Sequence, residues 1–436
     1  MFLAAAPYFQ SRFHTSQSLL ANFQPAEISI SSIVNLVTLI ILTNLQTGAS
    51  YPRRIVLSLI LNVATFTFLS ISTKAFLAAT AAQYFVFLMI IVALASAAAG
   101  FMQNGAFAFA AGMGRQEYVQ ALMAGQGVAG IIPLVVQIAS TLSTGDAQDD
   151  ARAAAEGLSD SALVYFVTAT AVEAIALGAF VYLERRYRRR QVKVAPSLAQ
   201  DPADGQDDDD DHDPSLANDI APLASTAPHS QPHHPTRTPL LTLFRQLFYP
   251  SLAITITFAI TMLFPVFTAE IVSTHPESSP ILRPAAFIPL SFLIWNTGDL
   301  LGRLVPLVRR LSLADHPKIL FLLSLARIVF IPLYYLCNIQ RGSNDSNNIA
   351  SIAALALSIR KAAPSSTSSV YGDFFYLAIV QFPFGLSNGY IGSCCMMGAT
   401  SEKYVEEDQR EAAGSFMGLC LVLGLTIGSV ASFAVT

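Results

Sequence analysis

The chain has 436 residues, of which 53% are hydrophobic and only 12% are charged. Soluble domains carry roughly 25% charged residues, so this composition excludes an ordinary soluble globular protein. The formal net charge is -4, and no basic patch of the kind that binds nucleic acid is present. The sequence therefore predicts an all-α polytopic membrane protein with the lipid bilayer, and no nucleic acid, as its surroundings.

The first apolar stretch, residues 1–9, is too short to cross a bilayer, which takes roughly 20 helical residues. We expect it to be the outer half of a first helix that is truncated at its N-terminal end. Ten complete spans follow it. They are expected near residues 28–45, 55–76, 84–111, 118–143, 161–183, 250–271, 285–306, 319–336, 373–397 and 412–436.

A polar segment at residues 184–245 divides the chain into six spans before it and five after it. It opens with an arginine cluster, continues in an acidic run at 207–211, and becomes rich in Pro, Ser, Thr and His. Such a composition cannot bury a core, so we expect a disordered cytoplasmic loop. The loop would separate an N-terminal bundle, residues 1–183, from a C-terminal bundle, residues 246–436, and two such bundles suggest rocking around a central site.

Basic residues gather in alternate loops, which are expected to face the cytoplasm. The long loop before the span at 373–397 falls on the outer side in this arrangement. It contains Asn344-Asp345-Ser346, a candidate N-glycosylation site at Asn344, although Arg341, Arg360 and Lys361 in the same loop count mildly against the orientation.

The span at 285–306 carries charges that a membrane tolerates only when they are paired or functional. Asp299 and Arg303 are four residues apart and share one helix face, with Asn296 about one turn earlier. One interpretation is an internal salt bridge that fixes the helix to its neighbours. The other is a binding site in which Asp299 accepts and Arg303 donates hydrogen bonds to a polar solute.

Two further polar groups stand inside apolar spans. Gln103 and Asn104 offer amides, which can read the edge of a nucleobase or join neighbouring helices. Asn388 belongs to a third polar patch, where Pro383 and Gly385 are expected to kink the helix.

Gly125, Gly127 and Gly130 match the G-x-G-x-x-G pattern of dinucleotide-binding proteins. The pattern requires a preceding strand, which a membrane span does not provide, so we interpret these glycines as sites of close helix packing. The four cysteines lack the spacing of metal ligands, and no catalytic constellation stands out. The sequence thus predicts neither an enzyme nor a bound cofactor or metal.

Several motifs occur in an order that resembles the equilibrative nucleoside transporters, the solute carrier family 29 type. The motifs are Ala6-Pro-Tyr-Phe9, Gln103-Asn-Gly105, Gly125-Gln-Gly-Val-Ala-Gly130, Phe264-Pro265, Trp295-Asn-Thr-Gly-Asp-Leu-Leu-Gly-Arg303, Ser387-Asn-Gly-Tyr390 and Glu411-Ala-Ala-Gly414. The resemblance implies eleven helices in a six-plus-five bundle related to the major facilitator fold. It also implies facilitative transport of nucleosides, with nucleobases as possible further substrates, by alternating access.

The same resemblance implies roles for individual residues. Asp299 and Arg303 would engage the ribose, and Gln103 or Asn104 would contact the base, with the glycine spacing favouring Asn104. Leu3 would line the pocket from the first helix. Family members continue upstream through a Trp-Asn pair, and a first helix truncated after that pair would be expected to weaken transport.

Two alternatives stay open at this point. The first is proton-coupled nucleoside transport at a vacuolar or lysosomal membrane, with Glu173, Glu270 or Asp299 as the titrating acid. The second is a non-transporting trafficking or receptor protein similar to the distantly related battenins. We expect a monomer in the plasma membrane or in a vacuolar or lysosomal membrane. The motifs do not fix purine, pyrimidine or nucleobase preference.

Overall fold

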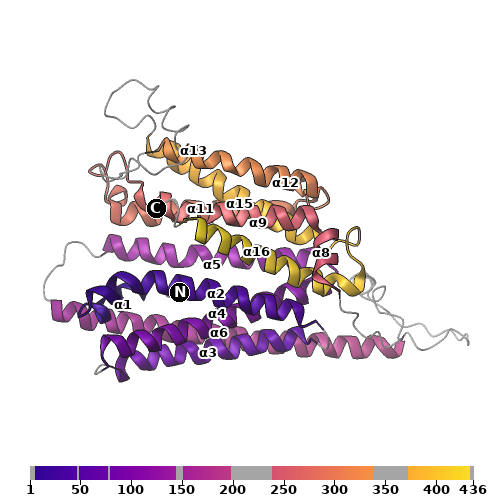
Figure 1. Cartoon of the computed structure of the whole chain (residues 1–436), viewed down its shortest axis with the longest axis horizontal. Helices are drawn as coiled ribbons and strands as arrows, with labels where there is room; N and C mark the ends of the chain where they lie inside the picture. Colours follow the sequence, from indigo (N-terminus) through magenta and orange to yellow (C-terminus); the bar gives the residue numbers. More distant parts are fainter. Residues whose placement is uncertain are drawn as a thin grey trace, which may run out of the picture.

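The computed structural model describes residues 5–46, 49–76, 79–143, 151–197, 238–337 and 372–432. Regular structure in these residues is helical, and the long helices run side by side along the longest axis of the molecule (Figure 1). Nine helical segments in the described part are long and apolar enough to cross a membrane. The prediction of an all-α polytopic membrane protein is therefore confirmed.

Six helices form what we call the first half. They are α1 (Ala6–Phe13), α2 (Gln17–Asn44), α3 (Tyr51–Ala75), α4 (Ala81–Gly112), α5 (Gln116–Ser143) and α6 (Ala151–Ser197). All except the short α1 contain a candidate span. α6 extends past the expected boundary at residue 183, because Arg, Gln and Lys are good helix formers and sustain the helix beyond its apolar part. The start of the expected loop is thus helical, and so are its last residues, which belong to α8 (Leu240–Gln246). Residues 198–237 lie outside the described part.

The second half contains the remaining helices. They are α8 (Leu240–Gln246), α9 (Phe248–Thr261), α10 (Phe264–Glu270), α11 (Pro284–Leu304), α12 (Pro317–Ala326), α13 (Phe330–Tyr335), α15 (Phe382–Gly398) and α16 (Arg410–Ser432). α9 with α10, and α12 with α13, each make one span. A π-helical segment, Phe375–Gln381, runs directly into α15, and together they supply the span expected at 373–397. With α1 as the short first helix, the described helices follow the expected six-plus-five order.

Local sequence signals explain where α4 begins and ends. At its start the Thr80 hydroxyl accepts from the Gln83 backbone, and the Gln83 side chain accepts from the Thr80 backbone. These two bonds satisfy backbone donors that a helix end leaves open. After its end, Gly114 adopts a φ of 72°, a conformation that glycine adopts without strain.

Close packing of α11 on α15 positions the charged pair that the sequence singles out. Gly298 and Gly302 on α11 face the α15 backbone, and Gly385 and Gly389 on α15 face the α11 backbone. At each of these four positions an added Cβ would overlap a main-chain carbonyl oxygen of the other helix. The small residues therefore bring the two backbones into direct contact.

The two halves are joined mainly near one end of the helices, which we call the basic end. It carries the connections at 113–115, 305–316 and 399–409 and lies to the right in Figure 1. A buried apolar cluster there combines Met123 of the first half with Phe416 of the second half.

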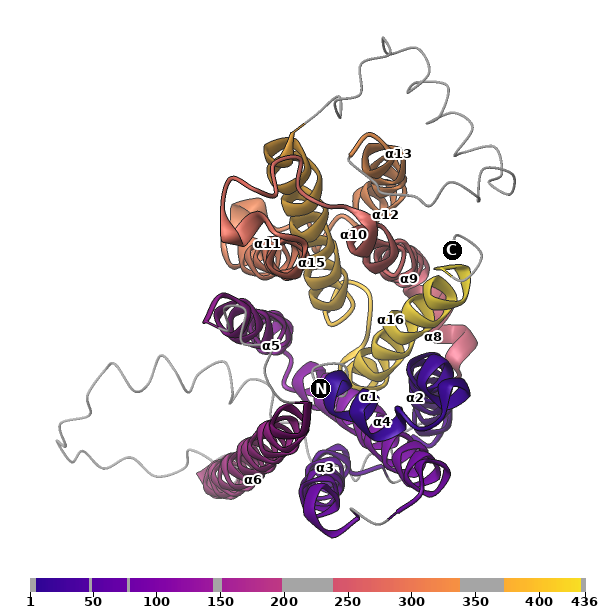
Figure 2. The same cartoon turned by 90° about the vertical axis from the view of Figure 1, so that its left-hand side faces the viewer.

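At the opposite end, which faces the viewer in Figure 2, each half has its own apolar cluster. The described members of one, which include Tyr84, all belong to the first half. Those of the other, which include Phe264, all belong to the second half. The clusters indicate that the halves pack together at the basic end and separate toward the opposite end.

Candidate functional site

Asp299 and Arg303 form the ion pair that their spacing predicts. Arg303 Nε donates to Asp299 Oδ2 at 2.7 Å, and the exposed fractions of the two residues are 6% and 3%. The second carboxylate oxygen, Oδ1, accepts from Asn388 Nδ2 at 2.7 Å. The pair lies in the last two turns of α11, on the basic side of the helix centre. Asn388 thus joins the pair, while Asn296 uses its amide nitrogen to donate to Phe292 of its own helix.

Arg303 also connects the second half to the first. Its Nη1 donates to the Met123 carbonyl at 2.8 Å and to Gln126 Oε1 at 3.2 Å, both on α5. Gln120 of α5 in turn donates to the Arg303 carbonyl at 3.2 Å. The two interpretations of this pair, an internal salt bridge and a binding site, are compatible. The Arg303 guanidinium bonds to Asp299 and to α5 of the first half at the same time.

The polar network continues from Asn388 into the second half. Thr261 Oγ1 donates to Asn388 Oδ1 at 2.7 Å, and Arg327 Nη2 donates to Thr261 Oγ1 at 2.9 Å. A continuous path of hydrogen bonds therefore joins two buried guanidinium groups to a single carboxylate. Buried networks of this kind tend to fix one arrangement of their helices.

Arg327 is a buried charge of this network that the sequence analysis did not single out. It is 1% exposed, donates to the Phe384 carbonyl at 2.9 Å and to the Ser387 hydroxyl, and lies 4.3 Å from the centre of the Phe384 ring. None of the ion pairs between described residues includes it. The available signal was a lone charge inside the apolar span at 319–336, which a membrane penalises.

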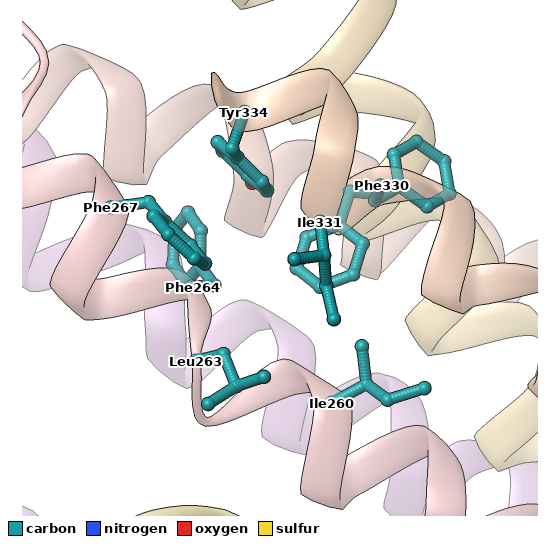
Figure 3. Close-up of a pocket in the computed structure, with 8 residues that line it drawn as sticks. Ile260, Leu263, Phe264, Phe267, Phe330, Ile331 and Tyr334 are labelled. Atoms are coloured by element: carbon teal, nitrogen blue, oxygen red, sulfur yellow. The ribbon is translucent and has the colours of Figure 1, made fainter. Parts of the chain in front are cut away.

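An aromatic cluster lies next to Phe384, the ring that Arg327 contacts, and most of its members are shown in Figure 3. Phe264, Phe267, Phe330, Tyr334 and Phe384 converge there on a cavity too small to admit a water molecule. Arg327 itself is 1% exposed, and its Nε is buried without a hydrogen-bond partner among the described residues. The bonds made by Nη1 and Nη2 are therefore the ones whose loss would leave further buried donors unpaired.

We expect Arg327→Lys to destabilise the protein by about 2 kcal/mol, because a single ammonium cannot reproduce the planar set of charged hydrogen bonds. The measurement is the midpoint of thermal unfolding of the purified chain. Arg245→Lys is the matched control, since Arg245 is exposed on α8. Equal midpoints for the two variants would contradict this assignment.

Asn104, the amide that the sequence favoured for the base, lies in a buried polar network near the basic end. It is fully buried, accepts from Arg54, and donates toward Thr43 and Ser415. Ser415 belongs to α16, so this network crosses between the halves near the basic end. Gln103, the other candidate amide, is partly exposed. Leu3 and Asn344 lie outside the described residues.

The three glycines of the G-x-G-x-x-G pattern do not behave alike. A Cβ on Gly130 would overlap the Asn296 amide oxygen, and one on Gly127 would lie 3.1 Å from Leu300 Cδ1 and 3.2 Å from Arg303 Cδ. Both positions therefore serve the contact of α5 with α11. Gly125 has nothing within 4 Å of such a Cβ.

The remaining candidate chemistry is sparse in the described part of the chain. No group of three or more His, Cys, Asp or Glu side chains there could hold a metal ion.

Glu173 accepts from Asn62 at 3.3 Å where α6 meets α3, far along the chain from the Asp299 network. Trp295 stacks on Phe264 at 4.9 Å, and its indole nitrogen has no hydrogen-bond partner among the described residues.

Comparison with known proteins decides the family. The family model described as nucleoside transporter matches residues 88–436, which is most of the chain. The chain belongs to the nucleoside transporter family. This confirms the resemblance that the motifs carry and the expectation of a transporter, not an enzyme. It also agrees with the multi-pass membrane location.

Two curated nucleoside transporters align with nearly the whole of this chain. Nucleoside transporter FUN26 of Saccharomyces cerevisiae is 28% identical, with 99% of this chain and 80% of the yeast protein covered. Equilibrative nucleoside transporter 1 of Rattus norvegicus is 27% identical, with 99% of this chain and 92% of the rat protein covered. A solved structure of FucP, a major facilitator superfamily transporter in the outward conformation, has a TM-score of 0.43 at 14% identity, covering 99% of this chain and 97% of that chain.

Proposed function

We propose that the protein carries nucleosides across its membrane by facilitative transport with alternating access. The observation that supports this most directly is the double engagement of Arg303. It pairs with Asp299, the candidate ligand of the substrate, and it holds α5 of the other half. A substrate that competes for either partner would change how firmly the two halves are joined.

The chemistry of the pair suits a ribose. Asp299 accepts hydrogen bonds and Arg303 donates them, so together they can bind neighbouring hydroxyl groups. Trp295, one turn earlier on α11, offers an indole N–H that no described residue uses. Of the two amides proposed for the base, Gln103 is partly exposed, whereas Asn104 is enclosed by Arg54, Thr43 and Ser415.

The arrangement of contacts corresponds to one state of the transport cycle. Each hydrogen bond that joins the halves through described residues lies on the basic side, including Arg303 to Gln126 and Asn104 to Ser415. If basic loops face the cytoplasm, this is a state closed toward the cytoplasm. Opening at that end requires these bonds to break, and their replacement at the opposite end would complete the exchange of access.

A cysteine pair at the basic end tests this cycle. A Cβ on Gly112 of α4 would lie 2.7 Å from Glu411 Cγ of α16, so cysteines at both positions can approach to bonding distance. We expect Gly112→Cys/Glu411→Cys to lose uptake when oxidised and to recover it after reduction, because the disulfide holds the basic end shut.

Each single cysteine variant serves as a control, since neither can form the bridge. Undiminished uptake by the oxidised double variant, with the disulfide verified by mass spectrometry, would rule out opening at this end during transport.

We further propose that the nucleoside gradient alone drives the movement. The three acids considered for proton coupling lie in separate settings: Asp299 is paired with Arg303, Glu173 bonds to Asn62, and Glu270 ends α10. They form no continuous path through the described contacts. Facilitative carriage therefore requires the fewest additional groups.

A further inference from the structure

A groove of about 510 Å³ opens between α3 and α6 near the basic end, on the rim of the first half. Both helices lie on the side of the first half away from α9 and α13 (Figure 2). On α3 the lining follows a helical stripe. Its members are Arg53, Val56, Leu57 and Ile60. On α6 the stripe is Val181, Glu184 and Arg185.

α3 packs on both α4 and α6, and the groove opens beside the contact between α3 and α6. The Ser58 hydroxyl of α3 donates to the Ala98 carbonyl of α4 at 2.7 Å. From α6, Phe180 and Tyr187 contact the Phe109 ring at 5.8 and 6.0 Å between ring centres. The residues that line the groove take no part in these contacts. Their side of the two helices therefore faces the membrane, where lipid covers an apolar surface.

The lining is apolar along the helices and basic at one end. Leu57 and Ile60 are 42% and 49% exposed, which gives an acyl chain an open wall to contact. Arg53 stands at the start of α3, and Arg185 at the end of the apolar part of α6; both are exposed. Neither forms an ion pair with another described residue. Glu184 is the one acid in this lining, so the lining stays net positive.

We propose that this groove binds an anionic phospholipid from the leaflet at the basic end. The phosphate would lie between Arg53 and Arg185, and an acyl chain would follow Leu57, Ile60 and Val181 into the bilayer. Basic pockets between transmembrane helices on the cytoplasmic side recognise anionic headgroups in this way. A soluble anion would leave the apolar wall unused. The proposal is independent of what the protein transports.

The test is lipid retention by the full chain in native mass spectrometry. Purified protein is incubated with equal amounts of phosphatidylserine and phosphatidylcholine. The unchanged protein is expected to retain phosphatidylserine preferentially. Each arginine should contribute about fivefold to that preference, given the usual attraction of a basic residue to an anionic surface. Arg53→Gln/Arg185→Gln should abolish it.

Two further variants make the result decisive. Arg186→Gln removes an exposed arginine next to Arg185 that does not line the groove, and it should keep the preference. Ile60→Trp narrows the apolar wall and should lower retention of phosphatidylserine while both arginines remain. The proposal is overturned if the double glutamine variant keeps the preference, if Arg186→Gln loses it equally, or if Ile60→Trp retains phosphatidylserine as the unchanged protein does.

Discussion

Asp299→Ala and Arg303→Ala are each expected to lower nucleoside uptake at least roughly tenfold. Removing one member of a buried pair leaves the other charge without its partner, which typically costs ~3 to 5 kcal/mol, and 1.4 kcal/mol already corresponds to a factor of ten. The loss should be severe here because both residues are buried and Asp299 Oδ1 also holds Asn388. Uptake of labelled uridine into transporter-deficient cells, normalised to surface protein, measures it.

Asn44→Ala provides the control for this experiment. Asn44 is the last residue of α2, is exposed, and donates only to the Ile40 carbonyl of its own helix. Its removal should leave uptake nearly unchanged. Normal uptake by either Asp299→Ala or Arg303→Ala at full surface abundance would refute the assignment of the substrate site.

Gly389→Ala is expected to prevent assembly of the second half. The added Cβ would overlap the Asp299 carbonyl oxygen and lie 2.9 Å from the Arg303 backbone nitrogen. Overpacking a tight interface costs roughly 1 to 3 kcal/mol or more, and main-chain atoms cannot rotate aside as a side chain can. The yield of monodisperse protein after detergent extraction measures the effect, which should be near-complete loss.

Gly178→Ala on α6 is the matched control, because nothing lies within 4 Å of its added Cβ. Alanine is also the better helix former, so this variant should extract at least as well as the unchanged protein. Equal yields for Gly389→Ala and Gly178→Ala would mean that α11 and α15 are not in direct backbone contact.

Helical periodicity was sufficient to predict the Asp299–Arg303 pair. Residues four apart on a helix are neighbours whatever the rest of the fold does, so the pair follows from the sequence alone. The number and order of spans were predictable for a similar reason, because apolar length is a local property. The segment expected as a loop was less well predicted, because α6 continues past its apolar part and α8 forms before the next span.

The partners of the other polar residues depend on helices distant in the chain, and no local pattern reveals them. Arg54 and Arg410 fall just outside the expected spans at 55–76 and 412–436, among the basic residues expected in loops. The structure places Arg54 against Asn104, and Arg410 is 4% exposed and bonds Glu402 at 2.9 Å. Arg327 likewise gains its role only when α9 and α15 are brought beside it. Periodicity indicates which face a residue occupies, and only packing determines what it meets.

Counterflow in proteoliposomes tests the central claim most directly. The purified chain is reconstituted, the vesicles are loaded with unlabelled uridine or adenosine, and entry of the labelled nucleoside is followed. A carrier with alternating access should take up label faster into loaded vesicles than into empty ones, since bound nucleoside speeds the return of the site. Asp299→Ala should abolish the effect. Label entry that is absent, or equal in loaded, empty and protein-free vesicles, would contradict the account.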